Sequence, residues 1–173
     1  MGKANKVKAE LVGAADMVNL IQTLKDIADN KFYTLFNQKY KFRRFGESFV
    51  EFFRMISLTT VNHLLLSNKN KKTAIVVVTI EGSFLGQFNN KIITKAVEEK
   101  ANYEDSVFVA IGSKAADRLK SITPDLKSFI SMEATGYYEM AVKVKNYLVE
   151  EIMNGRLGKV VVVYAYPKSF DTQ

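Results

Sequence analysis

The sequence predicts an α/β protein in which a long N-terminal coiled-coil helix is followed by a small, mostly parallel βαβ domain of Rossmann-like type. Two observations predict this class. An apolar repeat with a period of seven residues runs through the first third of the 173-residue chain, and strand-like and helix-like segments alternate after residue 72. We therefore expect a coiled-coil helix over residues 1–68 and a separate α/β domain over residues 73–173.

The first segment is expected to form one helix from about Asn5 to Ser67. It contains no proline and only two interior glycines, Gly13 and Gly46. Every seventh residue from Ala14 to Ile56 is apolar, and a companion series from Leu11 to Phe53 is apolar at four of its seven positions. These series predict a left-handed coiled-coil interface formed by Ala14, Val18, Ile21, Ala28, Phe32, Leu35, Phe42, Phe49, Phe53 and Ile56.

A helix of this kind requires a partner. About 60 helical residues span about 90 Å, so part of the helix projects beyond a small domain. An apolar stripe left in water forfeits roughly 1.5–3 kcal/mol for each large side chain. Since no second segment of this sequence has comparable length, we expect the partner helix to come from another chain or from residues outside this sequence.

The second segment alternates between strand and helix patterns, which predicts right-handed crossovers and a mostly parallel sheet. The strongest signal is the apolar, β-branched run from Thr73 to Ile80, which is typical of a strand buried on both faces. The expected order continues with a helix over Gly86–Ala101, a strand over Val107–Ile111, a short helix over Gly112–Lys120, a brief strand at Phe129–Ile130, a helix over Gly136–Asn154 that ends at Gly155, and a strand over Lys159–Tyr166.

Composition and charge narrow the class of protein. The absence of cysteine excludes disulfides and thiolate sites, and no apolar run reaches the length of a membrane span, so we expect an intracellular chain. All of the net charge of +7 lies in residues 1–72, which contain 13 basic and 6 acidic residues, against 12 of each in residues 73–173. Such a basic segment suits either an acidic partner, including nucleic acid, or simply a solvated helix surface.

The residues themselves predict no catalytic, cofactor or metal site. The turn after the first strand fits neither a dinucleotide-binding nor a Walker motif, and the bulky Phe84 and Leu85 in it hinder close approach to a phosphate. His63 is the only histidine, which rules out a histidine-rich metal site. The adjacent pairs Glu98–Glu99 and Glu150–Glu151 point about 100° apart on helices, so neither forms a carboxylate dyad.

Four stretches, in order along residues 20–170, resemble the gamma subunit of F-type ATP synthases. LIQTLKDIADNK (Leu20–Lys31) is similar to the family's I-T-K-A-M-K-M-V-A-A-S-K, and TIEGSFLGQFNNKI (Thr79–Ile92) to T-S-D-R-G-L-C-G-G-L-N-S-N-I. In the second stretch Thr79, Gly86, Asn89 and Ile92 coincide, while Glu81 replaces Asp, Gly82 replaces Arg and Leu85 replaces Cys. The third and fourth stretches are Ile111–Lys120 and Asn154–Phe170.

The resemblance implies a non-catalytic central-stalk subunit that couples ATP synthesis or hydrolysis in a catalytic ring to rotation and proton transport. It implies partners, namely the alpha and beta subunits of the ring and an epsilon-like subunit, with a membrane rotor ring as a further candidate, and no nucleic acid or cofactor. The chain would then be cytoplasmic and peripheral to the membrane through these partners. Thr79, Glu81, Gly82, Gly86 and Asn89 are expected at a junction between the helix and the α/β domain, which would form the foot of the stalk.

The family's second long helix would follow Phe170, whereas this sequence ends at Gln173. The sequence is therefore either a piece of a longer subunit or a specialised relative whose helix pairs with another chain. Three further hypotheses stay open: an accessory linker of an F-like ATPase in a motility complex, a small nucleotide-binding α/β protein with a coiled-coil oligomerisation arm, and a nucleic-acid-binding protein that uses the basic segment.

Overall fold

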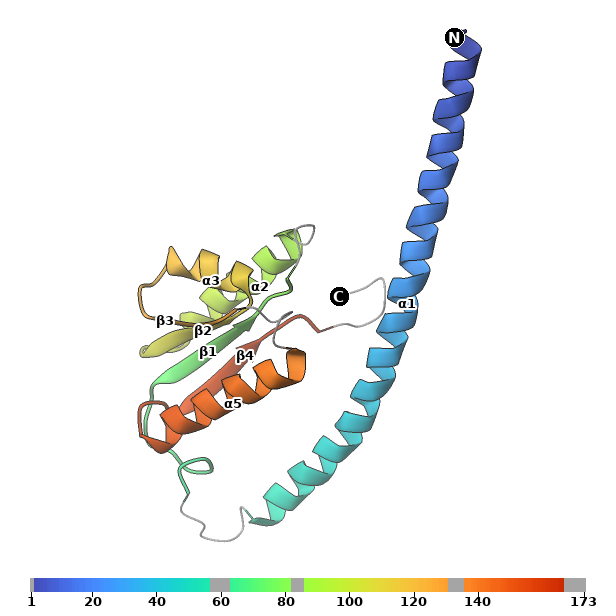
Figure 1. The fold of residues 1–173 in the computed structure, drawn as a ribbon. Coiled ribbons are helices and arrows are strands. Elements are labelled where there is room, and N and C mark those ends of the chain that lie inside the picture. The colour runs from blue at the N-terminus through green and yellow to red at the C-terminus, as the bar shows by residue number, and fades with distance from the viewer. Residues whose placement is uncertain (1, 57–62, 82–85, 131–135, 167–173) are drawn as a thin grey trace. The chain divides into compact units, whose positions relative to one another are not determined.

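The protein is described by a computed structural model over residues 2–56, 63–81, 86–130 and 136–166 (Figure 1). The chain forms two compact units, one that contains the long helix α1 and one that spans residues 61–166. Within its described residues, the second unit holds a four-stranded sheet and the helices α2, α3 and α5. A long N-terminal helix followed by an α/β arrangement is the fold class that the sequence predicts.

Helix α1 runs from Lys3 to Ile56, which is 54 residues and about 80 Å. The expectation that it continues to Ser67 is wrong for residues 63–67, which form a turn. There the amide N–H groups of Leu66 and Ser67 both donate to the His63 carbonyl at 2.8 Å. The Asn68 side chain next accepts a hydrogen bond from the Asn70 N–H, and such local bonds compete with helix formation.

The sheet has the strand order β3-β2-β1-β4, and all of its described neighbours are parallel. Strand β1 (Thr73–Val78) lies in the centre, with Thr73 opposite Ser106 of β2 (Ser106–Ile111) on one side and opposite Lys159 of β4 (Lys159–Val163) on the other. Strand β3 (Leu126–Phe129) pairs with β2 at the far edge.

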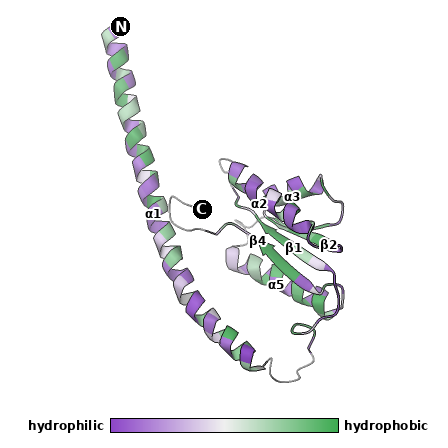
Figure 2. Cartoon of the chain, turned by 180° about the vertical axis from the view of Figure 1, so that it is seen from behind, coloured by the Kyte–Doolittle hydropathy of each residue, from purple (hydrophilic) through white to green (hydrophobic). Residues whose placement is uncertain are grey.

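Helices cover both faces of this sheet (Figure 1). Helices α2 (Gly86–Lys100) and α3 (Ser113–Lys120) lie on one face, and α5 (Tyr137–Met153) lies on the other. Alternate side chains along β1 enter the two layers of the core. Figure 2 shows that the central strands are hydrophobic. Ile75 and Val77 pack with α2 and α3, whereas Ala74 and Val76 pack in the α5 layer.

Several strand boundaries differ from expectation, and three of them differ by two residues or more. Strand β1 ends at Val78 instead of Ile80. The Thr79 hydroxyl bonds to the Ile111 carbonyl at the end of β2, and the Ile80 N–H bonds to the Asn89 side chain of α2. Strand β4 ends at Val163 instead of Tyr166, and its pairing with β1 ends at Val77 opposite Val163. Strand β3 begins at Leu126, three residues before the expected Phe129, because its length is set by pairing with β2.

Candidate functional site: the exposed face of α1 and the two ends of β1

The predicted coiled-coil face of α1 is open to solvent. Side chains are described for nine of its ten predicted residues; eight are exposed and Phe32 is half-buried, whereas the side chain of Ile56 lies outside the described part. Ile21 is 64% exposed and Phe42 is 73% exposed. Apolar and polar residues alternate along the whole helix in Figure 2. A stripe of large apolar side chains in water marks an interaction surface, because covering each one yields about 1.5–3 kcal/mol.

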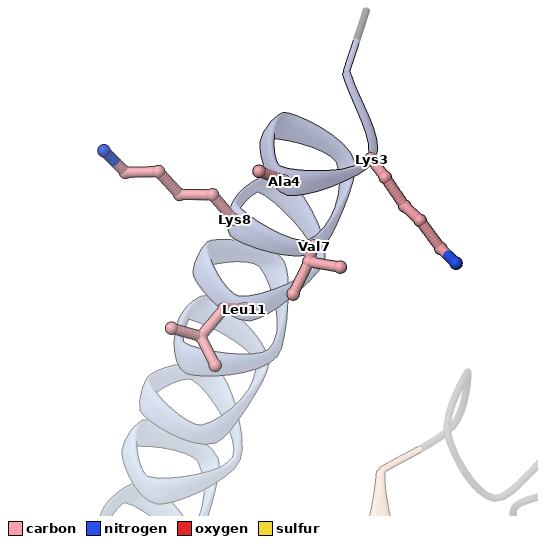
Figure 3. A pocket seen from close by; sticks show the side chains of 5 residues that line it. All are labelled: Lys3, Ala4, Val7, Lys8 and Leu11. Carbon is pink, nitrogen blue, oxygen red and sulfur yellow. The ribbon is translucent and has the colours of Figure 1, made fainter.

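The composition of this face changes along the helix. In the first turns, a shallow apolar patch is lined by Lys3, Ala4, Val7, Lys8 and Leu11, whose side chains Figure 3 shows. Farther along, aromatic rings form contacts one turn apart. The rings of Phe45 and Phe49 lie 4.8 Å apart between centroids, and those of Phe49 and Phe53 lie 6.4 Å apart. These i, i+4 contacts order the rings before any partner arrives.

The carboxyl end of β1 is held together by three residues expected at the helix–foot junction. The Thr79 hydroxyl donates to the Ile111 carbonyl and accepts the Ala115 N–H, both at 3.1 Å. Asn89 pairs with the backbone of Ile80: its Oδ1 accepts the Ile80 N–H (3.0 Å), and its Nδ2 donates to the Ile80 carbonyl (2.8 Å). Thr79 therefore attaches α3 to the end of β1, and Asn89 attaches α2.

Glu81 occupies the place at which a doubly wound fold would bind an anion. Its Oε1 accepts the Ser113 N–H at 2.8 Å, and its Oε2 accepts the Ser113 hydroxyl at 2.7 Å, so the carboxylate caps the first turn of α3. Gly112, the residue before Ser113, has φ +98°, and a Cβ at Gly112 would lie 2.7 Å from the Thr79 hydroxyl oxygen. This close approach requires glycine and leaves the edge filled by the protein's own groups.

Two of the predicted junction residues are glycines. Gly86 is the first residue of α2, and Gly82 lies outside the described residues, as do Phe84 and Leu85. The described members of the set, Thr79, Glu81 and Asn89, join elements within the α/β unit. Their assignment to a junction with the long helix stays a prediction.

A second anchor, which the sequence did not predict, lies at the amino end of β1, where the chain from α1 enters the sheet. Asn68 Nδ2 donates to the Leu157 carbonyl at 2.9 Å, and Asn70 Nδ2 donates to the Gly155 carbonyl. Gly158 approaches so closely that a Cβ there would lie 1.7 Å from the Asn70 carbonyl oxygen. The two asparagines and the glycines of N-G-R-L-G were visible signals, but their pairing spans more than 80 residues and only the fold reveals it.

A small recess near the amino ends of the strands is lined by charged groups. The lining residues are Lys72, Val107, Phe108, Asp125, Lys127, Tyr147, Glu151, Arg156 and Leu157. Two hydrogen bonds join Arg156 to Glu151, at 2.7 and 2.8 Å, and they lower the pKa of that carboxyl. Burial and then the Glu151 charge raise the pKa of Tyr147. Both pKa values are shifted away from neutral pH, so neither Glu151 nor Tyr147 suits proton transfer at neutral pH.

The carboxylate pairs and the histidine noted in the sequence have ordinary surroundings. Glu98 pairs with Lys95 at 3.0 Å, while its neighbour Glu99 accepts a hydrogen bond from the Tyr103 hydroxyl. His63 is exposed and accepts the Leu65 N–H. Over the described ranges, no three potential metal ligands of the His, Cys, Asp or Glu type lie together, and no helix has the length and hydropathy needed to cross a membrane.

Comparison with known proteins identifies relatives. The model of the family described as ATP synthase matches residues 3–173. The chain is similar to the ATP synthase gamma chain of Desulforudis audaxviator, with 26% identity over 106 residues that cover 60% of this chain and 36% of that protein. It is 25% identical to the gamma chain of Halothermothrix orenii over 115 residues, 65% of this chain and 40% of the relative. The gamma chain of Enterococcus hirae is 33% identical over 64 residues, 35% and 21% of the two chains. In each case the aligned part spans less than half of the relative's length.

Proposed function

Since the chain belongs to the ATP synthase gamma family, we propose that it is a non-catalytic, central-stalk subunit of an F-type or F-like rotary ATPase. One observation supports this most strongly. Helix α1 is 54 residues long and exposes an apolar stripe with a seven-residue period over residues 11–53. In the α/β unit that follows, Glu81 caps α3 at the carboxyl end of β1. A long helix with a sustained apolar stripe, joined to a unit in which Glu81 already caps α3 among the described residues at the sheet edge, suits a mechanical part better than an enzyme.

In this proposal α1 is one helix of the coiled coil that forms the stalk, and the α/β unit is the foot of the stalk. Torque passes between the helix, over Ala14–Ile56, and the foot. The covalent path from the helix reaches the sheet at Asn68–Lys72, where side chains and backbone are bonded to the loop before β4. Thr79, Glu81 and Asn89 then hold α2 and α3 firmly to the end of β1, so that the foot turns as one body.

The partners follow from the family. The alpha and beta subunits of the catalytic ring surround α1, and an epsilon-like subunit or a membrane rotor ring binds the foot. The chain is therefore peripheral to the membrane through its partners. The excess of basic residues in the first 72 residues favours acidic surfaces on the ring, because opposite charges steer association.

The test is affinity purification of the tagged chain from its native source, followed by quantitative mass spectrometry of the subunits recovered with it. We expect alpha and beta subunits of an ATPase, with one copy of this chain for each catalytic hexamer. Recovery without either subunit would refute the proposal. More than one copy for each hexamer would instead support an accessory linker between ATPase units.

A further inference from the structure

The recess at the amino ends of the strands collects charged groups that lie far apart in the sequence. Lys72 precedes β1, Lys127 lies in β3, Arg156 precedes β4, and Tyr147 and Glu151 come from α5. This amino-end recess has a volume of about 240 Å³, which is below the range of about 300–1,000 Å³ typical of sites for drug-sized ligands. A small group fits it best.

The backbone around the amino-end recess is fixed by the protein itself. The Lys72 N–H donates to Asn70 Oδ1 at 2.7 Å, and the Lys72 carbonyl accepts the Gly158 N–H at 2.9 Å. On the other side, the Arg156 N–H donates to the Glu151 carbonyl at 2.9 Å. A ligand therefore meets a preformed frame and does not have to order the backbone.

The charges that line the recess are not balanced. Three cations, Lys72, Lys127 and Arg156, face two carboxylates, Asp125 and Glu151, which leaves a net charge of +1. Arg156 is bound to Glu151 through two hydrogen bonds, whereas none of the described ion pairs includes Lys72 or Lys127. The Arg156 hydrogen bond, and after it the charges of Arg156, Lys127 and Lys72, lower the pKa of Glu151, so both lysines act on the space that Glu151 occupies. Two ammonium groups remain for a further anion.

An aromatic wall holds one of these ammonium groups in place. Lys127 Nζ lies 5.2 Å from the centroid of the Tyr147 ring and 5.7 Å from that of Phe129, within the range of cation–π attraction. No described residue bonds to the Tyr147 hydroxyl, and burial, followed by the charge of Glu151, raises the pKa of this group. The hydroxyl therefore stays protonated at neutral pH and is available as a hydrogen-bond donor.

The net charge and the kind of donor narrow the class of anion. Lysine ammonium groups act as point charges on phosphate oxygens, whereas the planar arginine fork that matches a carboxylate is already used by Glu151. A phosphodiester carries one negative charge and would neutralise the lining. A phosphate dianion would instead leave a net charge of −1 beside Glu151 and Asp125.

We propose that the amino-end recess binds a phosphodiester group through Lys72, Lys127 and the Tyr147 hydroxyl. The group comes from one of two sources, the head of an anionic phospholipid or a soluble phosphodiester. The site lies within the α/β unit, at the end of the sheet opposite to Glu81. The inference therefore goes beyond the stalk function and does not depend on it.

The first test uses glycerophosphoglycerol, the head group of phosphatidylglycerol without its acyl chains, and the full 173-residue chain. Phosphorus NMR is expected to show saturable line broadening. Lys72→Gln/Lys127→Gln should raise the dissociation constant about fivefold or more, and Tyr147→Phe, which keeps the ring, about threefold. Circular dichroism melts check that each variant is folded.

The matched control is Lys91→Gln/Lys120→Gln. It removes the same charge from exposed positions of α2 and α3, on the other face of the sheet (Figure 1), and should leave binding unchanged. Absence of saturable binding, or equal weakening by the two double variants, would overturn the inference.

Vesicles distinguish the two sources of the phosphodiester. The full chain and both double variants are sedimented with vesicles of phosphatidylglycerol, and with vesicles of phosphatidylcholine for comparison. Loss of binding to phosphatidylglycerol in Lys72→Gln/Lys127→Gln alone would uphold the site and assign it to a lipid. Recess-dependent binding of glycerophosphoglycerol without recess-dependent binding to vesicles would uphold the site and assign it to a soluble ligand.

Discussion

Glu81 shows how one side chain closes the ligand edge of the sheet. Its carboxylate accepts both the N–H and the hydroxyl of Ser113, so it replaces the external anion that a helix N-terminus attracts. The family resemblance pointed to Glu81 as the counterpart of an Asp, and the contact with Ser113 gives the residue a physical role within the α/β unit.

Removal of this cap should destabilise the foot. Glu81→Ala leaves the Ser113 N–H and hydroxyl without their acceptor, and we expect a loss of about 1–3 kcal/mol in the free energy of unfolding. Urea denaturation followed by circular dichroism measures the change. The control Glu104→Ala, at an exposed loop position, should change stability by less than about 0.5 kcal/mol. Equal effects of the two variants would contradict the capping role.

The ion pair between Glu151 and Arg156 makes a prediction about pH. The pair lowers the pKa of Glu151 in the folded state from its usual 4.5, so its contribution to stability is present above pH 4.5 and is lost as the pH falls through the lowered value. Glu151→Gln should therefore flatten the fall in stability on acidification below pH 4.5. Thermal melts across this range, with Glu150→Gln as the control, provide the measurement. A fall as steep in the Glu151 variant as in the wild type would disprove this contribution.

Some residues of the site could be read from the sequence, and others could not. Thr79, Glu81 and Asn89 belong to a stretch that resembles a family motif, so the motif alone singled them out. Asn68 and Asn70 lie in a short polar loop whose bonds reach carbonyls more than 80 residues away. No local pattern encodes such a pairing, because it exists only once β4 has been placed beside β1.

At the scale of the elements, α1 was the most predictable part because its period is local and sustained. The ends of the strands were less predictable. Strand β3 extends from Leu126 to Phe129 because β2 provides partners from Phe108 to Ile111, and no local pattern in the β3 sequence indicates these ends. The expected continuation of the helix to Ser67 was also wrong for residues 63–67, where apolar residues continue in a turn.

The two interior glycines of α1 allow the helix to be strengthened without new contacts. A Cβ at Gly13 or at Gly46 would meet nothing within 4 Å, so alanine removes only the conformational cost of glycine, about 1 kcal/mol for each site. Gly13→Ala and Gly46→Ala should each raise the helix content and the melting temperature of α1, as followed by far-ultraviolet circular dichroism. A decrease in either variant would show that its glycine is needed for the helical path.

At the scale of the whole molecule, the protein combines two units with different needs. The α/β unit buries its own core on both faces of the sheet, whereas α1 exposes most of its large apolar residues. The sequence predicted both parts, since strand runs and the seven-residue period are local signals. The arrangement of α1 within an assembly depends on its partners. The proposed stalk function concerns this arrangement, in which partner subunits enclose α1.

The most direct test of this account is the chemical accessibility of the predicted coiled-coil face of α1 in the native complex. The chain contains no cysteine, so Ala28→Cys places one thiol on that face, and Ser121→Cys places one at an exposed position of the foot as a control. We predict that a maleimide labels Cys at position 28 quickly in the isolated chain and much more slowly in the assembled ATPase, while labelling at position 121 serves to normalise the rates. Equal normalised rates for position 28 in the two preparations would contradict the claim that α1 is enclosed by a partner as part of a rotary stalk.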